Sequence, residues 1–188
     1  NGRTAEGEPV SVLAENGVIA DVRRGVVHPG DTGGHRTVDA GGRLVSAGLV
    51  DMHVHFREPG YEYKEDIESG SRAAARGGFT TVACMPNTRP PLDNAETVRR
   101  VNERAESVGV VRVLPYGCIT VGQQGRELAD FESLKAAGVI GFTDDGVGVQ
   151  NAGLMKEAMR RAAALGLPVV AHCEENTLLD GGAVTDGV

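Results

Sequence analysis

The chain has 188 residues, 40% of them apolar, which is enough to bury the core of a folded domain. Its 19 basic and 26 acidic residues leave a net charge of −7, which argues against nucleic acid or an anionic membrane surface as a partner. The apolar runs are too short for a transmembrane helix, and residues 1–9 lack the pattern of a signal peptide. Three widely spaced cysteines are typical of a reduced protein, so we expect a cytoplasmic location.

Residues 1–46 are expected to form a small all-β unit. Short β-rich segments are separated by glycine-rich turns, and the region has no helical period. The expected strands are 10–13, 17–20 and 37–39.

From residue 47 onward, apolar strands alternate with helices. The expected strands are 48–55, 79–84, 110–116, 139–143 and 168–172, and the expected helices are 65–76, 94–108, 127–137 and 151–165. Asp93-Asn94 is predicted to provide the N-cap of the second helix, and Asn151 that of the fourth. Strands that are apolar throughout and separated by helices indicate a parallel sheet. Residues 178–188 are rich in glycine and are expected to add no further element.

Two folds satisfy this alternation. A doubly wound sheet would be complete after five strands, whereas a (β/α)8 barrel would be about half complete. The order of helices and strands alone does not distinguish them.

The residues able to carry chemistry lie at the ends of predicted strands. His53 and His55 project from the same face of the first long strand, and two imidazoles on one face can bind a divalent ion. His172 ends the fifth strand, and Asp144 and Asp145 follow the fourth. Each alone has a plain structural explanation, as a hydrogen-bonded core histidine or a loop-capping aspartate. Their common position favours a site, because both folds place their sites at the C-terminal ends of strands.

Two further polar residues follow strands. Arg57 comes two residues after the histidine pair, where its guanidinium could hold a substrate carboxylate with two parallel hydrogen bonds; a surface salt bridge is the structural alternative. Asn87 could donate to the same anion, although an Asx-turn is the better explanation of this residue taken alone.

These residues lie in motifs that resemble a known family. The segment GLVDMHVHFREPG at 48–60 closely resembles the metal-binding signature of dihydroorotases in the amidohydrolase superfamily. The likeness continues through KED at 64–66, GGFTT at 77–81, MPNT at 85–88, FTDDG at 142–146 and AHCE at 171–174.

The resemblance implies the N-terminal half of a (β/α)8 barrel over residues 47–188, preceded by part of a small β-sandwich over residues 1–46. It implies reversible cyclisation of N-carbamoyl-L-aspartate to dihydroorotate in pyrimidine biosynthesis, at a pair of zinc ions. His53 and His55 match ligands of one zinc, and His172 matches a ligand of the other.

Many relatives bridge the two metals with a carboxylated lysine from the fourth strand. This sequence has no lysine there, and Asp145 stands at the position of the aspartate that replaces it in a bacterial subgroup. Asp144 is the less favoured alternative for the bridge. Arg57 and Asn87 match residues that hold the substrate α-carboxylate.

The same resemblance predicts that three or more further βα units follow Val188, carrying the general base, and that this chain alone is inactive. A small-molecule substrate is expected, and a second copy of the chain and aspartate transcarbamoylase are the candidate protein partners. Alternative interpretations are an allantoinase or dihydropyrimidinase-like hydrolase, against which Arg57 argues, and a non-catalytic scaffold for aspartate transcarbamoylase, which would usually have lost its metal ligands.

Overall fold

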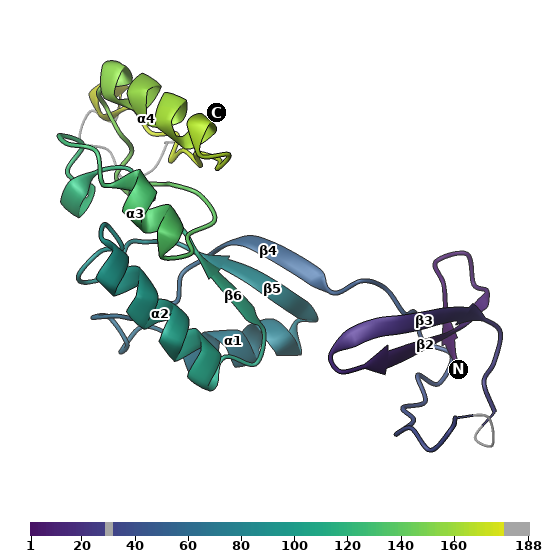
Figure 1. Ribbon diagram of the computed structural model, residues 1–188. Coiled ribbons are helices and arrows are strands. Elements are labelled where there is room, and N and C mark those ends of the chain that lie inside the picture. The colour runs from purple at the N-terminus through teal and green to yellow at the C-terminus, as the bar shows by residue number, and fades with distance from the viewer. Residues whose placement is uncertain (29–31, 179–188) are drawn as a thin grey trace. The chain divides into compact units, whose positions relative to one another are not determined.

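The computed structural model describes residues 1–28 and 32–178 and divides the chain into two compact units, Asn1–Gly48 and Leu49–Val188 (Figure 1). The division falls two residues after the boundary expected from the sequence. Residues 178–188 are expected to add no further element. Apart from Leu178, these residues lie outside the described part of the chain. No helix in the described ranges is long and apolar enough to cross a membrane.

The first unit contains a three-stranded antiparallel sheet. Its strands are β1 (Gly2–Arg3), β2 (Pro9–Glu15) and β3 (Val18–Arg24), in the order β1-β2-β3. Asn16 and Gly17 connect β2 to β3 with φ angles of 51° and 78°, as a two-residue hairpin turn with positive φ at both positions requires. The predicted strands 10–13 and 17–20 therefore belong to one hairpin, with somewhat longer strands.

The predicted strand 37–39 is wrong. Those residues pair with no strand in the described part of the unit, and Val38 is 78% exposed. A β-rich sequence becomes a strand only when a neighbouring strand accepts its hydrogen bonds. Other large apolar side chains exposed on this unit include Val18, Ile19, Val22 and Leu44.

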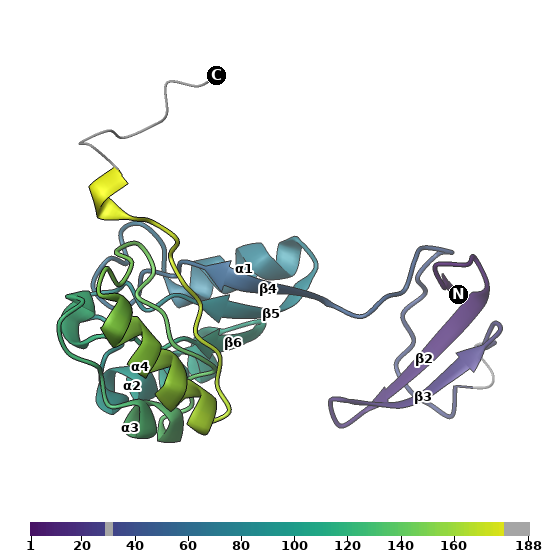
Figure 2. The same ribbon diagram turned by 90° about the horizontal axis from the view of Figure 1, so that it is seen from above.

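The second unit begins with a parallel sheet. Its strands are β4 (Leu49–Val54), β5 (Phe79–Cys84) and β6 (Arg112–Pro115), and they lie side by side in that order (Figures 1 and 2). The helices are α1 (Ile67–Arg76), α2 (Ala95–Val108), α3 (Phe131–Ala136) and α4 (Ala152–Ala164), with single 3-10 turns at Val121–Gln123 and Asn176–Leu178.

The helices start where side chains satisfy the first backbone N–H groups. Asn94 and Asn151 cap α2 and α4 as predicted, by accepting from the N–H groups of Thr97 and Leu154. Asp66 caps α1, so that helix begins two residues later than predicted. The predicted helix 127–137 shortens to α3 because Asp130 accepts from the N–H of Ser133 and so starts the helix there.

The predicted strands 139–143 and 168–172 are wrong as regular strands. They form only isolated parallel bridges, from Gly117 to Phe142 and from Phe142 to Val169. Pro115 and Pro168 accept from the N–H groups of Ile140 and Phe142 but have no N–H to donate in return, so the ladder is incomplete at these two points.

The order of these segments distinguishes the two candidate folds. Pairing runs from β4 to β5 to β6 and on through Phe142 to Val169, always to the next segment in the sequence. Helices α1 and α2 pack against β5 and β6 and against each other, so both cover the same face. A doubly wound sheet reverses its strand order and has helices on both faces, whereas a barrel does neither. The unit is the N-terminal part of a (β/α)8 barrel.

The core of this unit lies between the sheet and its helices. Ile67 of α1, Val98 of α2 and Val82 of β5 are fully buried there. Further along, the rings of Phe131 and Phe142 stack with centroids 3.8 Å apart and connect α3 to the bridge at residue 142. This packing fixes the C-terminal ends of the strands relative to one another.

Candidate metal centre

The histidine pair projects from the end of β4. His53 lies in the strand and His55 directly after it, and their ring centroids are 5.1 Å apart. Alternation along the strand turns both side chains to one face. The Asp51 carboxylate accepts from the His53 N–H at 3.0 Å, which helps to fix this end of the strand.

Asp144 and Asp145 turn to opposite sides of the backbone. The Asp144 Oδ1 accepts from the N–H groups of Ile119 at 2.8 Å and Thr120 at 3.1 Å, and its Oδ2 accepts from the Thr120 hydroxyl. Burial raises the pKa of Asp144, and these three hydrogen bonds oppose that rise. Asp144 therefore fixes the segment at 119–120, and Asp145 faces the histidines.

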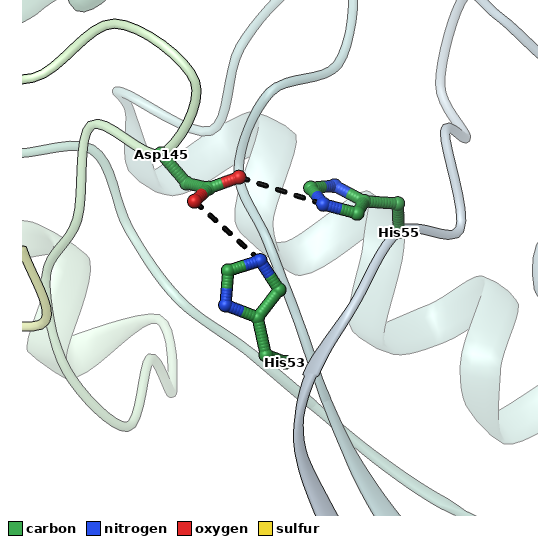
Figure 3. A group of neighbouring side chains, drawn as sticks. All are labelled: His53, His55 and Asp145. Atoms are coloured by element: carbon green, nitrogen blue, oxygen red, sulfur yellow. Dashed lines mark ion pairs between the residues drawn. The ribbon is translucent and has the colours of Figure 1, made fainter. Parts of the chain in front are cut away.

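The Asp145 carboxylate lies among imidazole nitrogens. Its Oδ1 is 3.4 Å from His53 Nε2 and its Oδ2 is 3.5 Å from His55 Nε2 (Figure 3). One donor atom from each of the three residues lies within 4.8 Å of the other two. Only 9% of the Asp145 side chain is exposed, so the carboxylate has little contact with water.

These separations fit a metal ion. Two ligands of one tetrahedral zinc ion, each about 2.0–2.2 Å from the metal, stand about 3.4 Å apart. The nitrogen–oxygen distances of 3.4 and 3.5 Å match that spacing and are long for hydrogen bonds. Neutral imidazole and carboxylate are the donors that such an ion takes. The residues present therefore fit a divalent metal.

His172 brings a third imidazole to the same carboxylate. Its Nδ1 lies 3.6 Å from Asp145 Oδ1, and its Nε2 lies 3.2 Å from Glu174 Oε2. Glu174 was not predicted as a site residue, although it stands two residues after the strand-end His172, a spacing that puts two side chains on the same side of an extended backbone. A carboxylate at the second ring nitrogen fixes the tautomer of a histidine ligand.

Asn87 makes two contacts within this cluster. Its Oδ1 lies 3.0 Å from His55 Nδ1, and its Nδ2 donates to Asp145 Oδ2 at 3.4 Å. If Nδ1 of His55 carries the proton, it donates to Asn87, and the lone pair of Nε2 faces Asp145. Asn87 thus orients the two donor groups, a function that the sequence did not indicate. Its predicted contact with substrate stays a prediction.

Arg57 follows the cluster in an unusual backbone conformation. Its φ is 56°, which L-residues other than Asn and Asp rarely adopt, and its side chain is half-buried. Within residues 1–28 and 32–178, no hydrogen bond or ion pair is made by its guanidinium. A strained arginine that follows the histidine pair in the sequence, and whose guanidinium has no partner among those residues, is a candidate anion-binding group.

Parallel βα units with histidines and a carboxylate at their strand ends define a class of barrel metalloproteins. A family model described as Dihydro-orotase-like matches residues 42–188. The chain belongs to the dihydroorotase-like family.

Relatives and a solved structure agree with this membership. The chain is 53% identical over 181 residues to a dihydroorotase of Brevibacillus brevis and 56% identical over 177 residues to one of Halalkalibacterium halodurans. These alignments cover 96% and 94% of this chain but 42% and 40% of the relatives, so the chain spans about two fifths of their length. The L-hydantoinase (dihydropyrimidinase) of Arthrobacter aurescens superposes with a TM-score of 0.80 at 26% identity, over 96% of this chain and 41% of that one.

Proposed function

We propose that the protein containing this chain is a zinc-dependent dihydroorotase, which interconverts N-carbamoyl-L-aspartate and L-dihydroorotate in pyrimidine biosynthesis. The observation that carries the proposal is the donor group of His53, His55 and Asp145, whose ligand atoms all lie within 4.8 Å of one another. Identities above 50% to curated dihydroorotases support this activity over others on the same fold.

In this proposal His53, His55 and Asp145 would hold one zinc ion, and His172, together with Asp145, would hold the other. The metal pair would supply a nucleophile at neutral pH and polarise the scissile amide carbonyl of the ring. Asn87 keeps His55 and Asp145 oriented for this task, and Glu174 does the same for His172.

Arg57 binds the α-carboxylate of the substrate through two parallel hydrogen bonds, with Asn87 as a second donor. Holding the anion at a fixed point orients the ring amide and lowers the entropic part of the barrier. The assignment is supported by the Arg57 guanidinium, which has no partner in the part of the chain that the structure describes.

The likeness to a hydantoinase structure makes a dihydropyrimidinase-like or allantoinase activity the alternative. Those substrates lack the carboxylate that Arg57 would hold. Assaying the full-length protein with dihydroorotate, dihydrouracil and allantoin decides between them. We expect turnover of dihydroorotate with at least tenfold preference, and equal turnover of dihydrouracil would contradict the proposal.

A non-catalytic scaffold is tested by the metal content of the same preparation. The proposal requires zinc, at two ions per site.

The proposal also includes a cytoplasmic location and, as protein partners, a second copy of the chain or aspartate transcarbamoylase. Light scattering of the purified protein with and without that enzyme tests both partners.

A further inference from the structure

We propose that Glu58 and Arg104 are positioning residues that hold Arg57 in its strained, anion-binding conformation. The inference rests on the proposed function, because it assigns a purpose to the Arg57 conformation. Neither residue is a ligand of the candidate metal centre.

The need for such residues follows from the turn at Arg57. The Phe56 carbonyl accepts from the Glu58 N–H at 2.6 Å, which closes a three-residue turn around Arg57 at φ 56°. A γ-turn with positive φ at its centre is rare and strained. Strain of this kind persists only where the surrounding structure fixes the residues on both sides.

The residue before Arg57 is fixed by packing. Phe56 is 5% exposed and lies against α1 at Gly70, where an added Cβ would come within 2.4 Å of the phenyl ring. Only glycine at that position allows the ring to lie so close to the helix.

The residue after Arg57 is Glu58, and both oxygens of the Glu58 carboxylate fix its position. Glu58 Oε2 accepts from the N–H of Ile67, the first residue of α1, at 2.9 Å. Glu58 Oε1 accepts from Arg104 Nε of α2 at 3.0 Å. The Glu58 side chain is only 17% exposed, which strengthens a charged pair relative to one at the surface. One carboxylate thus connects the turn to two helices.

The next two residues are fixed by backbone contacts. The Pro59 carbonyl accepts from the Arg89 N–H at 2.8 Å, and a Cβ on Gly60 would meet the Arg89 carbonyl oxygen at 2.0 Å. Every neighbour of Arg57 in this loop is therefore anchored, whereas the Arg57 guanidinium has no partner in the described ranges. The loop holds the backbone and leaves the guanidinium available to an anion.

The test is a set of variants in the full-length protein, assayed with dihydroorotate. Glu58→Gln removes the charge from the Glu58–Arg104 pair but can still accept from Ile67. We expect its KM to rise about tenfold, with kcat within about twofold and zinc content unchanged, because the substrate anion is bound less well. Arg104 lies on a partly exposed helix face, so Arg104→Met should fold. This variant should also raise KM, and it tests the Glu58–Arg104 pair if the Glu58 variant does not fold.

Glu68→Gln is the matched control. It removes an ion pair of the same 3.0 Å length, with Arg72, from the first turn of α1, without touching the loop. Its KM should stay at the wild-type value.

The deciding measurement repeats Glu58→Gln in an Arg57→Met background. If Glu58 acts through Arg57, Glu58→Gln should raise KM less than twofold in the Arg57→Met background, because the effects of coupled residues are not additive. An equal rise in both backgrounds, or no rise in either, overturns the inference and leaves the proposed function intact. An unchanged KM in Arg57→Met itself overturns the inference together with the assignment of Arg57 to the substrate anion.

Discussion

Asp144 and Asp145 are neighbours in the chain, yet their carboxylates have opposite tasks. Asp144 accepts from two backbone N–H groups at 119–120, while Asp145 faces His53 and His55 at 3.4 and 3.5 Å. Asp144 holds the loop together, and Asp145 completes the donor group. Substituting each aspartate in turn therefore tests which of the two binds metal.

Asp145→Ala should lose at least one zinc ion per site and most of the activity, because it removes the carboxylate common to all three histidines. Asp144→Ala should keep both ions and instead lower the free energy of unfolding by about 1–3 kcal/mol, since buried N–H groups lose their acceptor. Metal analysis together with urea unfolding of both variants checks this. Loss of metal from the Asp144 variant alone would reverse the assignment.

Arg57→Lys should weaken the use of dihydroorotate far more than it weakens metal binding. Lysine keeps the positive charge but loses the planar pair of donors, at a cost of about 1.5–3 kcal/mol for a charged hydrogen bond. This corresponds to a fall in kcat/KM of roughly ten- to 150-fold, measured by the absorbance change of the ring. An unchanged kcat/KM would remove Arg57 from the site.

Removal of metal should destabilise the protein, because an ion bound only by the folded state adds its binding free energy to folding. We expect a chelator to lower Tm and added zinc to restore it. His53→Ala should have the lower Tm already and should not respond to chelator. His35→Ala is the control, since the His35 imidazole lies 3.5 Å from Glu15 in the first unit and is not one of the candidate metal ligands. An unchanged Tm of the wild-type protein on addition of chelator would contradict the metal centre.

The three cysteines should differ in reactivity. Burial raises the pKa of Cys84 to about 12 and raises that of Cys118 well above its usual value, so both stay protonated thiols at pH 8. Cys173 is exposed. A thiol reagent should therefore modify Cys173 first in the native protein and reach the other two on unfolding. Equal rates at all three cysteines before denaturation would show that the barrel core is not formed as described.

Local patterns predicted much of the second unit. The strand 79–84 is correct to the residue, and Asn94 and Asn151 mark helix starts because capping is a local interaction. The segments 139–143 and 168–172 were predicted less well, since a strand depends on the N–H groups of its neighbours and proline removes them. The same limit explains the error at 37–39, which has strand composition but no partner among the described residues.

For the site, the sequence indicated which residues would meet but not how they are oriented. The period of a strand predicted that His53 and His55 share a face, and the ends of parallel strands predicted their proximity to Asp145. The contacts of Asn87 with His55, and of Glu58 with Arg104, depend on side chains that are 32 and 46 residues apart in sequence. Pairs at such distances follow from the packing of βα units and leave no local signal.

The donors of the candidate metal centre have a consequence for how the chain folds. His53 and Asp145 lie far apart in the sequence, so the donor group is complete only when β4, β5, β6 and the bridge at Phe142 are all docked. An ion that requires both residues therefore binds only chains with the correct strand order. Metal uptake during refolding would report the docking of the fourth βα segment, and a chain that mispairs at β5 or β6 would finish its collapse without metal.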